Sequence, residues 1–145
     1  MAVASDAACG ARVDNPPDAR PLRVLLIEDS LLIREAVAEL VESDGLAYVA
    51  AVADSEAAAI ADLQANIYDV VIVDLKLREG SGFGVLRALQ DKKSGVLPIV
   101  FTNYATPAIR RRCAELGATW FFDKSSEFEE IGELIARQAA RHRLT

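Results

Sequence analysis

The sequence predicts an α/β fold of the doubly wound type, with a parallel five-stranded sheet between two layers of helices. Five short apolar runs alternate along the chain with five segments whose apolar residues recur at helical spacing. The runs are continuous rather than alternating, as expected of strands buried on both faces of a parallel sheet. A closed eight-stranded barrel needs about 250 residues. Because this chain has 145 residues, an open sheet with right-handed crossovers is favoured.

The apolar runs are the expected strands, and stripes of apolar residues mark the helices between them. The strands are expected at residues 22–27, 48–52, 70–73, 97–101 and 119–122. The helical stripes are Ile33, Val37, Leu40 and Val41; Ile60, Leu63 and Ile67; Val85, Leu86 and Leu89; Ile109, Cys113 and Leu116; and Ile131, Leu134, Ile135 and Ala139. Each stripe follows one strand, so the elements alternate in β-α order.

Residues typical of helix ends support this division. Glycines that favour a left-handed backbone follow three of the helical stretches, at Gly45, Gly95 and Gly117. Thr106 followed by Pro107 is typical of a helix N-cap with proline at the first helical position. Ser126 and Glu129 have the spacing of a capping box before the last helix.

Composition and charge exclude several functional classes. Residues 1–21 are rich in Ala, Asp and Pro and predict a disordered extension, so 22–145 form the single expected domain. The net charge of -6 argues against general nucleic-acid binding. Cys9 and Cys113 predict reduced thiols in the cytoplasm, and His142 alone does not support zinc or cysteine-histidine catalysis. No apolar stretch approaches the roughly 20 residues that span a bilayer.

Polar residues follow the expected strands where ligands bind to open α/β sheets. Glu28 and Asp29 follow the first strand, Asp74 the third, Thr102 the fourth and Lys124 the fifth. Each alone has a simpler explanation, since Asp often caps helices and Lys is usually a surface residue. If the strand order is 2-1-3-4-5, the three acids converge and raise one another's pKa. A Mg²⁺ ion would relieve this repulsion, and Lys124 would add a positive charge.

The chain resembles the receiver domain of bacterial two-component response regulators over roughly residues 22–142. The matching segments are 24–30 (Val-Leu-Leu-Ile-Glu-Asp-Ser), 69–75 (Asp-Val-Val-Ile-Val-Asp-Leu), 80–82 (Gly-Ser-Gly), 99–103 (Ile-Val-Phe-Thr-Asn), 117–118 (Gly-Ala) and 123–124 (Asp-Lys). In order, these segments are highly specific. The resemblance implies a flavodoxin-like (βα)5 sandwich of strand order 2-1-3-4-5.

The resemblance also implies a role for each matching residue of the site. Asp74 would be the phosphoacceptor, and Lys124 would pair with the charge of the phosphoryl group. Asp29 and Asp74 would bind Mg²⁺ directly, Glu28 through water and Lys76 through its carbonyl. Positioning and charge neutralisation are what phosphoryl transfer mainly requires.

Switching in the family depends on a threonine and an aromatic residue. Thr102 would bond a phosphoryl oxygen and draw the loop before the fourth helix towards it. Phe121 occupies the place of the aromatic that rotates inward and alters the face of the fourth helix, fifth strand and fifth helix. Phe121 is equally consistent with an ordinary core aromatic.

Several residues depart from the family pattern. Ser125 and Arg78 stand where proline is common, and Asn103 stands where a small residue is usual. Lys76 and Tyr104 occupy positions that tune the access of water to the phosphoryl group. A cation and a large ring there predict slow hydrolysis and a long-lived phosphorylated state.

The leading hypothesis is a stand-alone switch that is not an enzyme beyond its own phosphorylation and dephosphorylation. It would receive phosphate from a sensor histidine kinase or a histidine phosphotransfer protein and signal through an unknown downstream protein. No DNA-binding output domain and no membrane contact are expected. The alternative is an interaction module of the same fold that is never phosphorylated.

A third class comprises enzymes on a similar fold, such as a flavin carrier or an aspartyl phosphatase. Asp29 is acidic where a flavin phosphate would lie. Lys76 stands where a phosphatase usually has a second acid. Both residues disfavour this class.

Overall fold

The computed structural model describes residues 20–92 and 95–144 of the chain. Residues 1–19, which include Cys9 and nearly all of the predicted extension, lie outside the described residues. Within the described residues, no helix is both long enough and apolar enough to cross a membrane.

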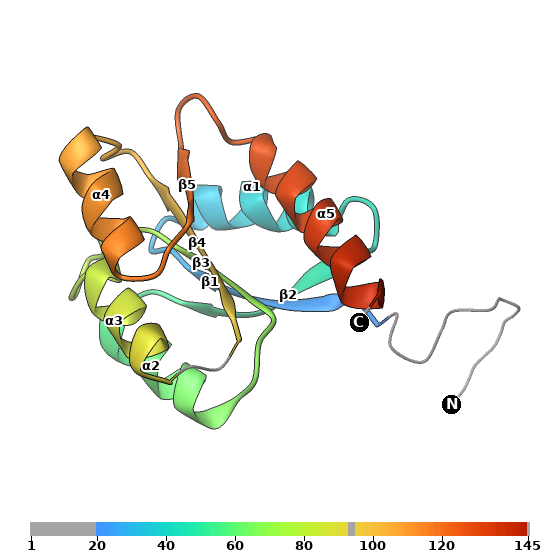
Figure 1. The fold of residues 1–145 in the computed structure, drawn as a ribbon, viewed down its shortest axis with the longest axis horizontal. Helices are drawn as coiled ribbons and strands as arrows, with labels where there is room; N and C mark the ends of the chain where they lie inside the picture. The colour runs from blue at the N-terminus through green and yellow to red at the C-terminus, as the bar shows by residue number, and fades with distance from the viewer. Residues whose placement is uncertain (1–19, 93–94, 145) are drawn as a thin grey trace, which may run out of the picture.

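Five strands and five helices alternate through the described residues, which confirms the predicted α/β fold (Figure 1). The strands are β1 (Leu22–Ile27), β2 (Ala47–Ala53), β3 (Val70–Val73), β4 (Leu97–Thr102) and β5 (Trp120–Asp123). The helices are α1 (Leu31–Glu42), α2 (Glu56–Ala65), α3 (Gly82–Lys92), α4 (Pro107–Glu115) and α5 (Glu130–Leu144). The sheet is parallel, with the predicted order β2-β1-β3-β4-β5.

The helices cover the sheet in two layers, with α1 and α5 on one face and α2, α3 and α4 on the other (Figure 1). Side chains of neighbouring residues in one strand point to opposite faces of the sheet. On β3, Val71 packs between the sheet and helices α2, α3 and α4, whereas Ile72 packs between the sheet and helices α1 and α5. All four β3 residues are buried. A strand covered on both sides needs apolar residues at every position, which accounts for its continuous pattern.

Most of the predicted helix boundaries are confirmed. Thr106 is the N-cap of α4, and its Oγ1 accepts the N–H of Ile109 at 3.2 Å. Three of the four described glycines with positive φ are those predicted to end helices, at Gly45, Gly95 and Gly117. The expected strand at residues 119–122 lies one residue later, at Trp120–Asp123.

Two expectations about helices are wrong. Ile67 is 84% exposed and lies beyond α2, because the N–H of Asn66 closes that helix on the carbonyl of Asp62. Ser126 does not cap α5, which begins only at Glu130. The chain first makes a turn in which the Asp123 carboxylate accepts the N–H and the hydroxyl of Ser125, at 2.8 and 2.6 Å.

The strand register brings the ends of β1 and β3 side by side. Ile27 pairs with Val73, and the N–H of Asp74 donates to the carbonyl of Ile27 at 3.0 Å. Gly82, the first residue of α3, packs directly on the same place, because a Cβ there would lie 2.3 Å from the carbonyl oxygen of Asp74. The residues after β1 and β3 are therefore fixed by the sheet and by the start of α3.

Candidate functional site

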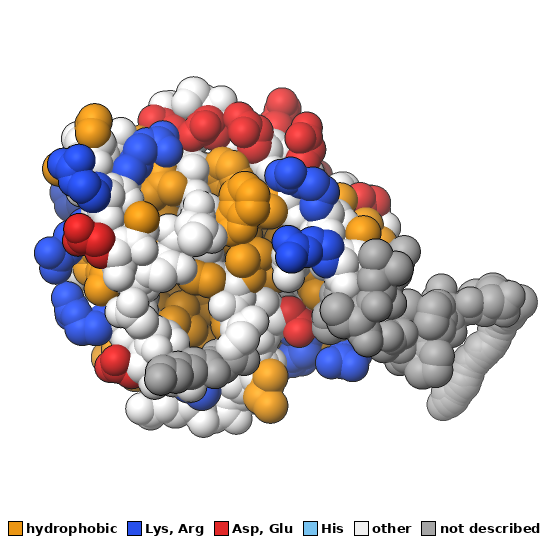
Figure 2. All heavy atoms as spheres, in the orientation of Figure 1, with side chains coloured by type: hydrophobic (Ala, Val, Ile, Leu, Met, Phe, Trp, Pro, Cys, Tyr) orange, Lys and Arg blue, Asp and Glu red, His pale blue; other side chains and the backbone are white. Residues whose placement is uncertain are grey.

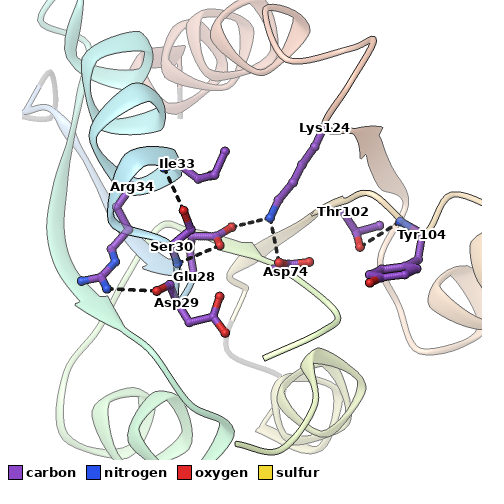
Figure 3. Close-up of polar contacts among 9 residues, drawn as sticks. All are labelled: Glu28, Asp29, Ser30, Ile33, Arg34, Asp74, Thr102, Tyr104 and Lys124. Atoms are coloured by element: carbon purple, nitrogen blue, oxygen red, sulfur yellow. Dashed lines mark hydrogen bonds and ion pairs between the residues drawn. The ribbon is translucent and has the colours of Figure 1, made fainter. Parts of the chain in front are cut away.

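Three carboxylates meet at the carboxyl edge of the sheet. Glu28 and Asp29 directly follow β1, and Asp74 directly follows β3. One carboxylate oxygen from each lies within 4.8 Å of those of the other two (Figure 3). Glu28 is 2% exposed and Asp74 is 7% exposed. The convergence predicted from the strand order is therefore present.

Lys124 reaches this acidic group from the end of β5. Its ammonium lies 2.7 Å from Oε1 of Glu28 and 2.7 Å from Oδ2 of Asp74, and so it bridges the two buried carboxylates (Figure 3). The backbone N–H of Lys124 donates to the carbonyl of Thr102 at 3.0 Å, which fixes the base of the side chain. One cation thus offsets part of the charge of three acids.

Burial and ion pairing act in opposite directions on these groups. Burial raises the pKa of Glu28, and the hydrogen bond from Lys124 lowers it only in part. For Lys124, burial lowers the pKa, but the hydrogen bonds and charges of Asp74 and Glu28 outweigh it, so the pKa of Lys124 is raised. Ionisation of the buried glutamate is therefore costly in the absence of a second cation.

The donor set fits a hard divalent cation. Oδ1 of Asp74 is buried and accepts no hydrogen bond within the described residues, although an unpaired buried oxygen is costly. Asp29 is half-buried beside it. Carboxylate oxygens are the ligands that Mg²⁺ prefers, and Mg²⁺ typically uses one or two of them together with water.

These acids line an open hollow of about 480 Å³ together with residues of the loops that follow β3 and β4. Lys76 lies in the first loop with an exposed side chain, and its ammonium is 5.5 Å from the ring centroid of Tyr104 in the second. Both residues line the hollow. One part of the lining of the hollow is therefore a cation in contact with an aromatic ring.

Thr102 ends β4 at the same edge and is fully buried. Its Oγ1 accepts the backbone N–H of Tyr104 at 3.3 Å (Figure 3). Because the hydroxyl oxygen is used here as an acceptor, the hydroxyl hydrogen is left free for another partner.

Phe121 lies on β5, away from the acids, and is half-buried against the core below α2, α3 and α4. The guanidinium of Arg110, on α4, lies 4.5 Å from its ring centroid. Phe121 therefore contacts α4 rather than the site itself.

Arg34 was not expected at this site from the sequence. It lies in the first turn of α1, and its Nη2 donates to the carbonyl of Asp29 at 3.4 Å (Figure 3). Its Nε is buried and has no hydrogen-bond partner among the described residues. The only signal in the sequence was its place four residues after Ser30, the N-cap of α1.

The raised pKa of Glu28 predicts how stability depends on pH. A folded-state pKa above the ordinary value of 4.5 gives stability that is present below that value and lost as the pH rises through the folded-state pKa. In metal-free protein, the unfolding free energy of the Glu28→Gln variant should increase relative to that of the wild type as the pH rises from about 4 to about 7.

Urea titrations in the presence of a chelator, repeated across this pH range, measure the difference. Glu39→Gln, which changes an exposed glutamate of α1, is the matched control and should show no such trend. A difference between Glu28→Gln and the wild type that does not vary with pH contradicts the raised pKa.

Comparison with known proteins places this geometry in a family. Residues 24–136 match the response regulator receiver domain. The chain is 36% identical over 115 residues to protein-glutamate methylesterase/protein-glutamine glutaminase 2 of Anaeromyxobacter dehalogenans, covering 79% of this chain and 33% of that protein. It is 28% identical over 119 residues to the acid tolerance regulatory protein ActR of Rhizobium meliloti, covering 81% and 60%. The chain thus spans only part of the length of both relatives.

Solved structures have the same fold. The signal receiver domain of NarL from Mycobacterium tuberculosis superposes with a TM-score of 0.76 at 26% identity, covering 83% of this chain and 98% of that one. The response regulator domain of Thermotoga maritima CheB gives 0.72 at 20% identity, covering 87% and 98%. With its sheet order, its acidic edge and the match over residues 24–136, this chain belongs to the response regulator receiver domain family.

Proposed function

We propose that this chain is a phosphoacceptor switch of a two-component phosphorelay, in which Asp74 takes a phosphoryl group from a phosphohistidine donor. One observation carries the proposal. Oδ2 of Asp74 is held by Lys124, Oδ1 has no partner within the described residues, and an oxygen of this carboxylate lies within 4.8 Å of oxygens of Glu28 and Asp29. A carboxylate placed in this way can offer one oxygen to a cation and the other to phosphorus, beside the Lys124 ammonium.

The proposed transfer exchanges one bond to phosphorus for another. An oxygen of Asp74 attacks, the P–N bond of the donor histidine breaks, and its electron pair stays on the ring nitrogen. Lys124, already 2.7 Å from Asp74, offsets the negative charge that gathers on the phosphoryl oxygens. The Thr102 hydroxyl, which accepts the N–H of Tyr104, keeps its hydrogen to donate to one of those oxygens.

Asp29, Asp74 and Glu28 are the side chains that would hold a divalent cation, with the backbone carbonyl of Lys76 as a further ligand. When bound, Mg²⁺ neutralises negative charge on the phosphoryl oxygens. The chain's own residues supply the nucleophile, the ammonium and the hydroxyl. Catalysis by this chain is then limited to its own phosphorylation and dephosphorylation.

The face formed by α4, β5 and α5 is proposed to change on phosphorylation and to bind the downstream protein. Movement of Thr102 towards a phosphoryl group would pull on Tyr104 and so on the loop before α4. Phe121 is in contact with Arg110 of α4, and Trp120 lies beside Arg137 of α5, with 5.6 Å between ring centroid and guanidinium. Figure 2 shows hydrophobic side chains between α4 and α5, with basic side chains over α4 and acidic ones at the start of α5. The proposed partners are a sensor histidine kinase or histidine phosphotransfer protein, and a downstream protein that binds this face.

Incubation with acetyl phosphate and Mg²⁺ tests the proposed phosphorylation. Intact-protein mass spectrometry should show the gain of one phosphoryl group, and Asp74→Asn should abolish the gain because its amide is not a nucleophile. Asp54→Asn, which changes an exposed acid after β2, is the matched control and should retain the gain. If the wild type gains no mass, the alternative of an unphosphorylated interaction module is favoured. If Asp74→Asn gains as much as the wild type, Asp74 is not the phosphoacceptor.

The pair formed by Lys76 and Tyr104 predicts a long-lived phosphorylated state. Both residues line the hollow that Asp74 also lines, so their side chains would restrict the access of water to a phosphoryl group on Asp74. Tyr104→Ala should speed loss of the phosphoryl group by roughly tenfold, equivalent to about 1.4 kcal/mol of barrier. Tyr48→Ala, at an exposed tyrosine on β2, should leave the rate unchanged. Loss of label from the wild type within seconds, or an equal lifetime in Tyr104→Ala, contradicts this role.

A further inference from the structure

Glu56 connects the start of α2 to the loop between β3 and α3. It is the first residue of α2, and its Oε1 accepts the backbone N–H of Ser81, just before α3, at 2.9 Å. Its own backbone N–H donates to the carbonyl of Glu79 at 3.1 Å, and Ser55 pairs with Glu79 in a parallel bridge. Both the side chain and the backbone at the start of α2 are therefore bonded to the loop between β3 and α3.

Two glycines make room for the Glu56 side chain. A Cβ at Gly84 would lie 2.1 Å from Oε2 of Glu56, and a Cβ at Gly80 would lie 2.4 Å from its Cβ. Real Cβ atoms do not approach other atoms so closely. The first turn of α3 and the loop before it are thus shaped to accept this carboxylate.

The position of the carboxylate is also favourable electrostatically. The first N–H groups of a helix have no partners within the helix, and the helix dipole favours negative charge at that end. At α3, Glu56 accepts the N–H of Ser81, and the Ser81 hydroxyl oxygen accepts the N–H of Phe83 at 3.0 Å. Glu56 therefore caps α3 from a different helix, in addition to the local cap.

Ser81 links this contact to the candidate site. It pairs with Lys76 in an antiparallel bridge, and the N–H of the next residue, Gly82, donates to the carbonyl of Leu75 at 2.9 Å. The loop of residues 75–81 is therefore closed on itself at the point that Glu56 holds. The backbone of Lys76 lies opposite Ser81 in this bridge.

We propose that Glu56 is a positioning residue for the cation and phosphoryl site, because it fixes the loop that carries the backbone of Lys76. The inference rests on the proposed function, since the position of the Lys76 backbone affects the site only if its carbonyl binds a cation. Glu56 does not touch the reacting atoms and acts through Ser81. Residues that orient the ligands of a metal commonly change metal affinity by about 10-fold to 100-fold when they are replaced.

The surroundings of Glu56 allow it to be replaced without loss of the fold. It lines an open hollow between α2 and the β3-α3 loop, with Ile60, Gln64 and Glu79 also on its walls. Water can enter such an open hollow and satisfy the Ser81 N–H in place of the carboxylate. A change in the site can therefore be measured in a folded variant.

The test compares Glu56→Ala and Glu56→Gln with the wild type by two measurements. Hydrogen exchange of the Ser81 amide is followed in metal-free protein, and Mg²⁺ affinity is measured by isothermal titration calorimetry. Glu56→Ala should speed exchange at Ser81 and weaken Mg²⁺ binding by about tenfold. Glu56→Gln should keep most of the protection of the Ser81 amide and most of the Mg²⁺ affinity, because its amide oxygen can still accept the Ser81 N–H. Glu79→Gln removes one negative charge from the loop, as Glu56→Gln does at the start of α2, and should match the wild type in Ser81 exchange and in Mg²⁺ affinity.

A second variant tests the contact from the opposite side. Gly84→Ala places a methyl group where the Glu56 carboxylate lies, so alone it should speed Ser81 exchange and weaken Mg²⁺ binding as Glu56→Ala does. Added to Glu56→Ala, it should cause no further loss, since the clashing group is gone. Independent, additive effects of the two changes overturn the proposed contact.

The outcomes separate this inference from the proposed function. If the wild type binds Mg²⁺ and takes phosphate, but Glu56→Ala binds Mg²⁺ equally well, the positioning role is overturned and the phosphorelay function stands. If the wild type neither binds Mg²⁺ nor takes phosphate, both are overturned. Weakened Mg²⁺ binding with faster Ser81 exchange, in a variant that melts at the wild-type temperature, is the result expected.

Discussion

The ion pairs of Lys124 hold together an edge of the sheet that would otherwise carry uncompensated charge. Two carboxylates, Glu28 and Asp74, are almost completely buried at the ends of adjacent strands, and the Lys124 ammonium lies 2.7 Å from each. Removing one member of such a buried group leaves the others without compensation, which typically costs several kcal/mol. The charges also remain incompletely balanced, because Asp29 adds a third carboxylate within 4.8 Å. This residual negative charge is the physical basis for proposing a divalent cation.

The residues of the site are positioned by two different parts of the fold, the ends of buried strands and the loop between β3 and α3. The acidic residues follow strands that are buried on both faces, so their positions are set by the core and by the pairing of Ile27 with Val73. The backbone of Lys76, by contrast, belongs to a loop whose closure depends on contacts from α2 and α3. The sheet therefore sets the position of Asp74, whereas packing of the β3-α3 loop against α2 and α3 sets the position of the Lys76 backbone.

The fold and the acidic group could be predicted because they depend on patterns that are local or topological. Continuous apolar runs identify strands buried on both faces, and Glu28 and Asp74 follow two of these runs. The exposure of Ile67 could not be predicted, because the end of α2 is decided by a single bond from Asn66. The contact of Glu56 with Ser81, Gly80 and Gly84 also left no signal, since it joins residues more than twenty positions apart. Such contacts depend on how loops pack after the sheet has formed.

The carboxylates at this edge are proposed to form one cation site beside Lys124. Anomalous diffraction from crystals grown with Mn²⁺ in place of Mg²⁺ can locate such a site, since Mn²⁺ shares the preference of Mg²⁺ for oxygen ligands. We expect one anomalous peak in contact with Asp29 and Asp74, with the Lys124 ammonium still beside Asp74. Crystals that contain Mn²⁺ but show no peak at these carboxylates would contradict it.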